Sequence, residues 1–261
     1  MFNHLKNSFV NSFNKIPNNL RKHIRYLTFK WIPTIDCLNR NSDTRHHKQS
    51  KNQWFVDAQR NRIRNMIHNS NFGIISPYAP VALYNPINNE ISISPAFVDE
   101  FVLKFYNTSN KLQTYAGIGF VIAHELAHSI LYYYLINLSN EYEKTLNCFK
   151  QWNFQLFRHM NSSQLLETMA DLHGMRILIE FLKRTDNFQV INWNDFFFYF
   201  ALPWCDFRSS DNLPDNNHAP DSIRLQIVIQ YFYEIQHFID IKIESNIQTI
   251  KNRSTEHCLL F

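Results

Sequence analysis

The stretch Val121-Ile122-Ala123-His124-Glu125-Leu126-Ala127-His128 decides how the rest of this 261-residue sequence is interpreted. If it is helical, His124 and His128 lie one turn apart and about 40° around the axis, so both imidazoles face one side. Two imidazoles aimed at one point suit a zinc ion, whereas buried histidines without a partner would cost desolvation energy. Glu125 can take a proton from a water beside the metal. The stretch therefore predicts a buried helix that carries two zinc ligands and a general base.

A third ligand is needed, because a catalytic zinc normally has three protein ligands and an open position. The sequence Glu-Thr-Met-Ala-Asp at residues 167–171 lies in a second apolar stretch, so Glu167 and Asp171 share a helix face. Isolated buried carboxylates would be driven neutral, so we interpret Glu167 as the metal ligand and Asp171 as the partner of His124. The alternative is a salt-bridged carboxylate pair. His173 lies about 240° around the helix from Glu167 and is not expected to bind.

The charge is unevenly distributed along the chain. Residues 1–70 carry 13 Lys and Arg against three Asp and Glu, while residues 71–261 carry 13 against 19. An apolar content of 45% in 261 residues can fill the core of one large domain. We therefore expect a basic N-terminal arm with a helical remnant at 1–70 and a catalytic domain at 71–261.

Membrane and nucleic-acid contacts can be judged from the same pattern. The longest apolar runs, 130–138 and 196–202, fall short of the ~18 residues that a membrane span needs. Residues 1–33 show no secretory leader, because polar side chains interrupt any apolar region. The basic run of the arm would contact acidic lipid or nucleic acid, although such a run is more often a solvated face. We expect no nucleic-acid partner, and a membrane-surface contact only through the arm. The pattern does not indicate an oligomeric state.

The remaining segments predict a mainly α fold with a small β-sheet (α+β). Residues 81–84 and 90–94 read as two strands around the turn at 85–89. At a sheet edge this hairpin would accept an extended peptide as an added strand, and an ordinary packing hairpin is equally consistent. Gly117 and Gly119, just before the metal helix, would let another backbone come close. The helices are expected at residues 52–68, 118–137 and 141–157.

Two further features bear on chemistry. His218 and Arg224 flank a proline turn, where an imidazole can stabilise an oxyanion and a guanidinium can hold a carbonyl or carboxylate. Taken alone, they are a loop histidine and an arginine at the start of a helix. The four cysteines allow three pairings and leave the redox compartment open.

These pieces, in this order, resemble the neprilysin family of zinc metallopeptidases, which includes the endothelin-converting enzymes. The similarity runs from about Val81 to the last residue and covers the catalytic domain. The motifs that carry it are Asn85-Pro86, Asn89-Glu90-Ile91 and Pro95-Ala96 of the hairpin, Tyr115 to Gly119 before His124 to His128, Glu167 to Asp171, Phe197 to Cys205, His218-Ala219-Pro220 with Arg224, and Cys258 near the end.

The resemblance implies a thermolysin-like zincin fold and a zinc-dependent metalloendopeptidase that hydrolyses peptide bonds through a zinc-activated water. It implies an extracellular or plasma membrane-associated enzyme acting on peptides. The roles that it implies are zinc binding by His124, His128 and Glu167, general base catalysis by Glu125, orientation of a ligand by Asp171, transition-state stabilisation by His218, substrate contacts by Arg224 and the Ala82 backbone, and a disulfide between Cys148 and Cys258.

The sequence departs from the family at several positions. Val81 stands where the family has an asparagine whose amide binds substrate, and Ser129-Ile130 replaces Gly-Phe after the second histidine. Most of the N-terminal helical lobe and the membrane anchor have no counterpart, and Cys205 is left with Cys37 as its remaining partner. The alternative function is therefore a homologue that keeps zinc and the fold but acts as a peptide-binding protein. A weaker alternative is an acidic-surface binder dominated by the basic arm.

Overall fold

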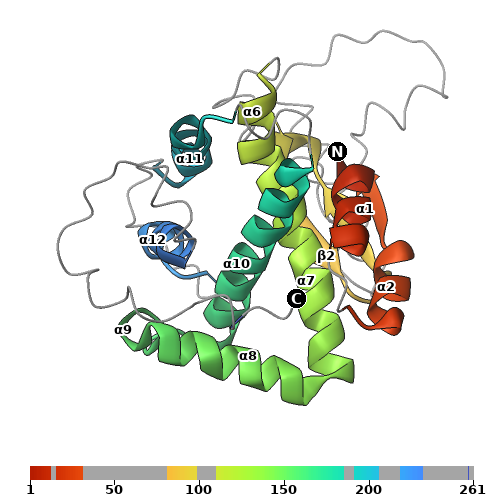
Figure 1. The fold of residues 1–261 in the computed structure, drawn as a ribbon, viewed down its shortest axis with the longest axis vertical. Coiled ribbons are helices and arrows are strands. Elements are labelled where there is room, and N and C mark those ends of the chain that lie inside the picture. The colour runs from red at the N-terminus through yellow and green to blue at the C-terminus, as the bar shows by residue number, and fades with distance from the viewer. Residues whose placement is uncertain are drawn as a thin grey trace, which may run out of the picture.

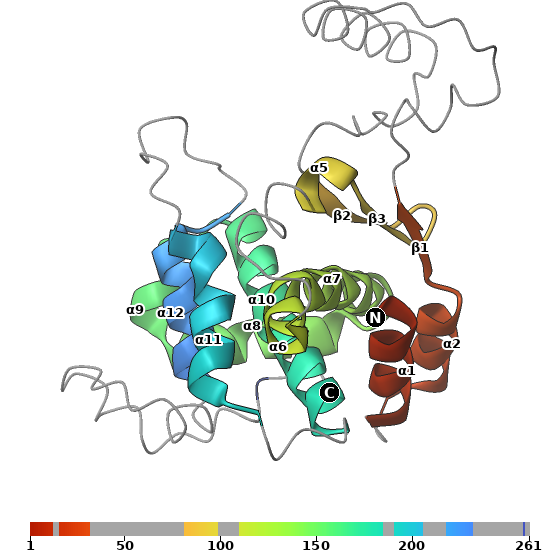
Figure 2. The same ribbon diagram turned by 90° about the horizontal axis from the view of Figure 1, so that it is seen from above.

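Two long helices, α7 (Phe120–Asn137) and α10 (Ser162–Lys183), lie side by side at the centre of the protein (Figure 1). The structure is a computed structural model that describes residues 1–12, 16–31, 81–98, 110–184, 191–205, 218–231 and 258. Helices α1 (Phe2–Ser12) and α2 (Asn18–Arg25) flank one side of the central pair, and α11 (Trp193–Ala201) and α12 (Asp221–Tyr231) flank the other. Figure 2 shows the small sheet lying along α7. The described fold is therefore mainly helical with one small sheet, as the sequence predicted.

Helix α7 is buried on almost all sides over its first half, which explains its apolar sequence. The short helix α6 (Lys111–Thr114) and the π-helical turn η2 (Tyr115–Gly119) run directly into it. The helix predicted at 118–137 is confirmed. The helix predicted at 141–157 forms as α8 (Ser139–Trp152) and α9 (Phe154–Phe157), because Asn153 leaves the helical region with φ −142° and ψ 73°.

Helix α10 starts at a capping box, which fixes the end that carries the predicted third ligand. The Asn161 side chain accepts a hydrogen bond from the backbone N–H of Gln164, and the Gln164 side chain accepts one from the backbone of Asn161. Two otherwise unpaired donors are thereby satisfied at the helix start. This start places Glu167 in the second turn of α10, on the side that packs against α7.

The sheet contains the predicted hairpin and a strand that was not predicted. Strands β2 (Ala82–Asn85) and β3 (Glu90–Ile93) pair antiparallel, with Ala82 opposite Ile93 and Asn85 opposite Glu90. Asn89 closes the turn with a φ of 49°, which asparagine tolerates better than most residues. Strand β1 (Thr28–Trp31) adds to β3 in parallel, so the order is β1-β3-β2. Strand β2 is thus an edge strand of the described sheet, and α5 (Pro95–Phe97) follows the hairpin.

The described part of the basic arm belongs to the main core. Leu5, Phe9 and Leu20 are fully buried in the same cluster as the central helices. His23 Nε2 lies 3.1 Å from Ser129 Oγ of α7, and the Asn89 side chain donates to the His23 carbonyl at 2.9 Å. These contacts tie α2 to both α7 and the hairpin. The predicted boundary at residue 70 and the predicted helix at 52–68 lie outside the described residues.

A disulfide links Cys148 of α8 to Cys258, whose Cα atoms are 5.3 Å apart. The residues joined are 110 positions apart, so the bond ties the end of the chain to the helical body. The pairing of Cys205 with Cys37 stays a prediction, because Cys37 lies outside the described residues. Within the described ranges, no helix combines the length and the apolar character that crossing a bilayer requires.

Candidate active site

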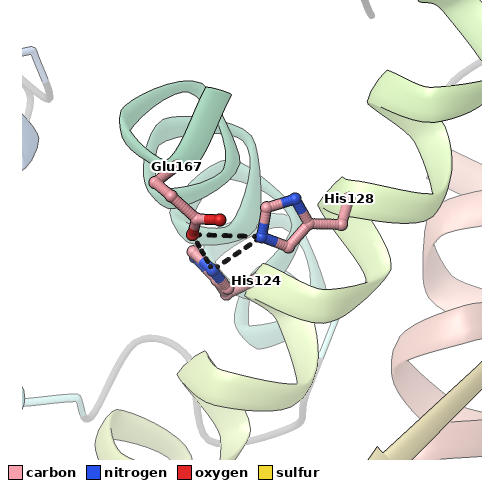
Figure 3. A group of neighbouring side chains, drawn as sticks. All are labelled: His124, His128 and Glu167. Carbon is pink, nitrogen blue, oxygen red and sulfur yellow. Dashed lines mark hydrogen bonds and ion pairs between the residues drawn. The ribbon is translucent and has the colours of Figure 1, made fainter. Parts of the chain in front are cut away.

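Three side chains from the two central helices meet at one point (Figure 3). His124 and His128 come from successive turns of α7, and Glu167 reaches them from α10. The two Nε2 atoms are 3.0 Å apart, and each lies 3.2 Å from Glu167 Oε2. The three atoms form a nearly equilateral triangle of one oxygen and two nitrogens.

The size of this triangle fits a tetrahedral metal ion. Zinc bonds of about 2.0–2.1 Å to nitrogen and oxygen place neighbouring ligands of a tetrahedron about 3.3 Å apart. The measured separations of 3.0 to 3.2 Å are close to that spacing. Three ligands would occupy one face of such a tetrahedron, which would leave one position for a water. The donor set of two imidazoles and one carboxylate is also one that catalytic zinc sites use.

Asp171 lies behind the triangle, between His124 and Arg224. Its Oδ1 is 2.9 Å from His124 Nδ1, so Asp171 contacts the ring nitrogen that faces away from the triangle. Arg224 of α12 donates from Nε to Oδ2 and from Nη2 to Oδ1, both at 2.7 Å. All of these groups are buried. A carboxylate held on both sides in this way fixes the imidazole orientation, which is the usual support of a metal-binding histidine.

The electrostatics of the cluster favour a positive charge at its centre. Burial alone would lower the pKa of His124, but contacts with Asp171 and Glu167 outweigh it and raise that pKa to about 10. Burial alone would raise the pKa of Glu167, but the imidazoles of His124, His128 and His218 hold it far below its usual range. Similarly, Arg224 and His124 lower the pKa of the fully buried Asp171 against the effect of burial. A metal cation would compete with a proton for the same environment.

The other predicted site residues surround this cluster. Glu125 is buried on α7 beside His124, and its negative charge also acts on that imidazole. His218 Nε2 lies 3.3 Å from Glu167 Oε2, and its side chain is 38% exposed, so it borders the cluster from the open side. Ala82 begins the edge strand β2 and is half-buried. Arg224 is turned toward Asp171, which the sequence prediction did not foresee.

A comparison with protein-family models matches residues 81–255 to peptidase family M13. The chain belongs to peptidase family M13. The resemblance to the neprilysin family is thereby confirmed, and no curated protein matches the chain. The matched region of this M13 chain starts at the hairpin and contains the whole cluster. Helices α1 and α2, which pack against its central helices, and strand β1, which pairs with β3, precede that region.

The close approach of α7 and α10 in this M13 chain depends on Gly174, which sequence reasoning missed. A Cβ at this position would lie 2.8 Å from both the backbone N and the Cα of His124, and 3.1 Å from the carbonyl carbon of Ala123. Gly174 follows Asp171 by three residues and Glu167 by seven, so all three lie on the face of α10 that meets α7. This spacing of three and seven residues is the sequence signal that could have identified Gly174. At Gly119, one of the two glycines predicted to let another backbone come close, a Cβ would first meet a side-chain atom, the Met1 sulfur, at 3.3 Å.

Two polar supports of this M13 site were also missed. The Arg224 guanidinium lies over the Trp204 ring, with Cζ 4.6 Å from the ring centroid. The ring thereby shields the ion pair between Arg224 and Asp171 from water. The Gln164 side chain donates to the His218 carbonyl at 3.2 Å and so ties the His218 loop to the start of α10. Both contacts join residues far apart in sequence, so no local sequence pattern predicts them.

Proposed function

We propose that this chain is a zinc-dependent metalloendopeptidase that hydrolyses peptide bonds. The observation that carries the proposal is the convergence of His124, His128 and Glu167, with ligand atoms 3.0 to 3.2 Å apart, beside the carboxylate of Glu125. Membership of a peptidase family gives the reaction class, and the spacing of the ligand atoms supports one zinc ion per chain. The substrates are then peptides.

The residues divide the chemistry among them. When bound, zinc supplies Lewis-acid chemistry, which makes a water nucleophilic near neutral pH and polarises the scissile carbonyl. Glu125 accepts the proton of the attacking water and delivers it to the leaving amine. His218 donates a hydrogen bond to the negative charge that develops on the carbonyl oxygen. Asp171 keeps the His124 ring aligned, so that the imidazole binds as the neutral Nε2 donor.

The peptide itself is held by two elements. The Ala82 backbone on the edge strand β2 pairs with an extended substrate, as a strand added to the sheet. Arg224 contacts a substrate carbonyl with the part of its guanidinium that Asp171 does not use, since the guanidinium has five N–H groups and two are paired with that carboxylate. Both assignments follow from the family motifs at these positions.

The test compares purified wild type with Glu125→Gln for bound zinc and for cleavage of a mixed peptide library. We expect equal zinc and a loss of cleavage of about 10²–10⁴-fold, the usual contribution of a general base. Glu167→Gln should lose zinc as well as cleavage. Glu180→Gln is the matched control, because Glu180 lies on the same helix as Glu167 but pairs with Lys183 and Arg176 instead of the cluster.

One outcome would favour a different function. If wild type binds a full equivalent of zinc and cleaves no peptide, the peptidase proposal is wrong. The chain would then be a homologue that keeps the metal and binds peptides without hydrolysing them, for which the replacement of the family asparagine by Val81 is the sequence argument.

We further propose that the protein acts outside the cell or at the plasma membrane. The Cys148–Cys258 disulfide supports an oxidising compartment, where such bonds persist. The exposed Lys22, Arg25 and Lys30 around α2 and β1 would provide any contact with an acidic membrane surface. Binding of wild type to anionic vesicles, measured at low and high salt, tests that contact.

A further inference from the structure

The second half of α7 exposes a row of large apolar side chains, here called the α7 stripe: Tyr132, Leu135 and Ile136. Their exposed fractions are 36%, 44% and 59%. No Asp, Glu, Lys or Arg occurs in residues 126–140, so the stripe has no charged neighbour along its own helix. Exposed apolar side chains gathered on one helix face often mark a surface that another chain covers.

The α7 stripe continues the face that carries the metal ligands. Leu135 lies about 20° and Tyr132 about 40° around the helix axis from His128, and Ile136 widens the row. Exposure also increases in this direction, from the buried His124 through the half-buried His128 to the stripe. Along the axis, Tyr132 is about 6 Å and Leu135 about 10 Å beyond His128. The stripe is therefore within a few extended residues of the candidate active site.

The open edge of the sheet lies next to the α7 stripe. Strand β2 packs beside α7 (Figure 1). The Tyr84 ring meets the Tyr132 ring edge-to-face, with the ring centroids 6.2 Å apart. Ser94 N–H donates to the Val81 carbonyl at 2.9 Å, so the backbone groups of Val81 point toward β3. Because hydrogen-bonded positions alternate along an antiparallel strand, the backbone groups of Leu83 and Asn85 also point toward β3. The backbone groups of Ala82 and Tyr84 consequently point away from β3, toward the edge where a further strand can pair.

We propose that the α7 stripe is a specificity surface for extended peptides with apolar side chains on one side of the scissile bond. Same-face side chains of an extended peptide recur every ~6.6 Å, so the second and fourth residues from the bond reach Tyr132 and then Leu135 with Ile136. A charged side chain at either position would lose hydration without gaining a partner, and is therefore disfavoured. This inference rests on the proposed peptidase function and adds the class of substrate.

The test measures binding separately from catalysis. Glu125→Gln protein loaded with zinc is incubated with a positional decapeptide library, and the retained peptides are sequenced by mass spectrometry. The test variant adds Leu135→Gln and Ile136→Gln, which keep a good helix former at exposed positions. The matched control adds Phe198→Gln, which removes a side chain 60% exposed on α11. Circular dichroism and zinc content check that each variant is folded and loaded.

The expected result is enrichment of Leu, Ile, Val or Phe at two alternate positions on one side of the site. The stripe variant should lose that enrichment and bind the enriched peptides about tenfold more weakly, while the Phe198→Gln control keeps both. Equal enrichment in the stripe variant and the control, or no peptide binding at all, would overturn the proposal. Failure of the peptidase function is seen separately, as zinc-loaded wild type that binds these peptides and leaves them intact.

Discussion

Gly174→Ala offers the sharpest test of how the candidate metal site is built. The added Cβ would lie 2.8 Å from His124 N and Cα, whereas ordinary contacts start at 3.4 Å. Helices α7 and α10 must therefore separate by about 0.6 Å at this point, because the contacted atoms are backbone and cannot rotate away. Overpacking of this kind costs roughly 1–3 kcal/mol, and the better helix propensity of alanine returns about 1 kcal/mol.

The larger effect should be on metal affinity. The separation moves Glu167 and Asp171 away from the histidines by more than the ~0.2 Å that metal–ligand distances tolerate. We expect zinc to bind about 10–100-fold more weakly, as when the support of a metal ligand is removed. Competition with a chromophoric chelator measures this, and thermal unfolding with and without zinc gives the stability of each form.

Gly119→Ala is the matched control for this experiment. A Cβ at Gly119 would meet the end of the Met1 side chain at 3.3 Å and the Thr114 carbonyl at 3.4 Å, contacts that small shifts relieve. It should change zinc affinity by less than about twofold, because it does not lie between the ligand-bearing faces. Wild-type zinc affinity in the Gly174→Ala protein would refute the idea that this glycine sets the distance between the ligands.

Three further predictions concern the surroundings of the site. Asp171→Asn keeps the shape but removes the charge beside His124, so zinc should bind about 10–100-fold more weakly by chelator competition, and unchanged affinity would argue against a supporting role. Burial lowers the pKa of His173 from 6.5 to about 4, so the unfolded state binds a proton more readily than the folded state. As the pH falls from 6.5 to 4, the free energy of unfolding should therefore decrease by up to about 3 kcal/mol. His173→Gln should flatten that part of the urea-denaturation pH profile relative to wild type, and an identical slope would contradict it. Reducing the Cys148–Cys258 bond, which closes a separation of 110 residues, should cost about 2–5 kcal/mol, seen as a lower Tm with a phosphine reductant.

Helical periodicity made the first half of the site predictable from sequence. A spacing of four residues puts His124 and His128 on one face whatever the rest of the chain does, and the apolar neighbours predict burial. Glu167 and Asp171 could be chosen because the same spacing recurs in a second apolar helix. The hairpin was predictable for a similar reason, since both strands flank a turn rich in asparagine and proline.

The features that sequence did not reveal depend on contacts between distant segments. Strand β1 pairs with β3 across some sixty residues, and a short strand in a basic segment carries no sign of its partner. The packing of α1 and α2 on the central helices was hidden by their charged and amide side chains, because only Leu5, Phe9 and a few others face inward. The spacing of Gly174 from Glu167 and Asp171 places it on the same helix face, but only the position of the α7 backbone shows that no side chain fits there.

Arg224 shows why a role inferred from a motif and the geometry of a side chain must be weighed together. Fully buried Asp171 would lack a compensating charge beside a His124 that binds a metal, since a metal-binding imidazole is neutral. The bidentate pair with Arg224 supplies that compensation, and Trp204 covers its outer side. The same guanidinium thus links the predicted substrate contact to the orientation of a predicted metal ligand. A change at Arg224 would consequently act on zinc affinity and on substrate binding together, whereas a change at Ala82 or in the α7 stripe would act on substrate binding alone.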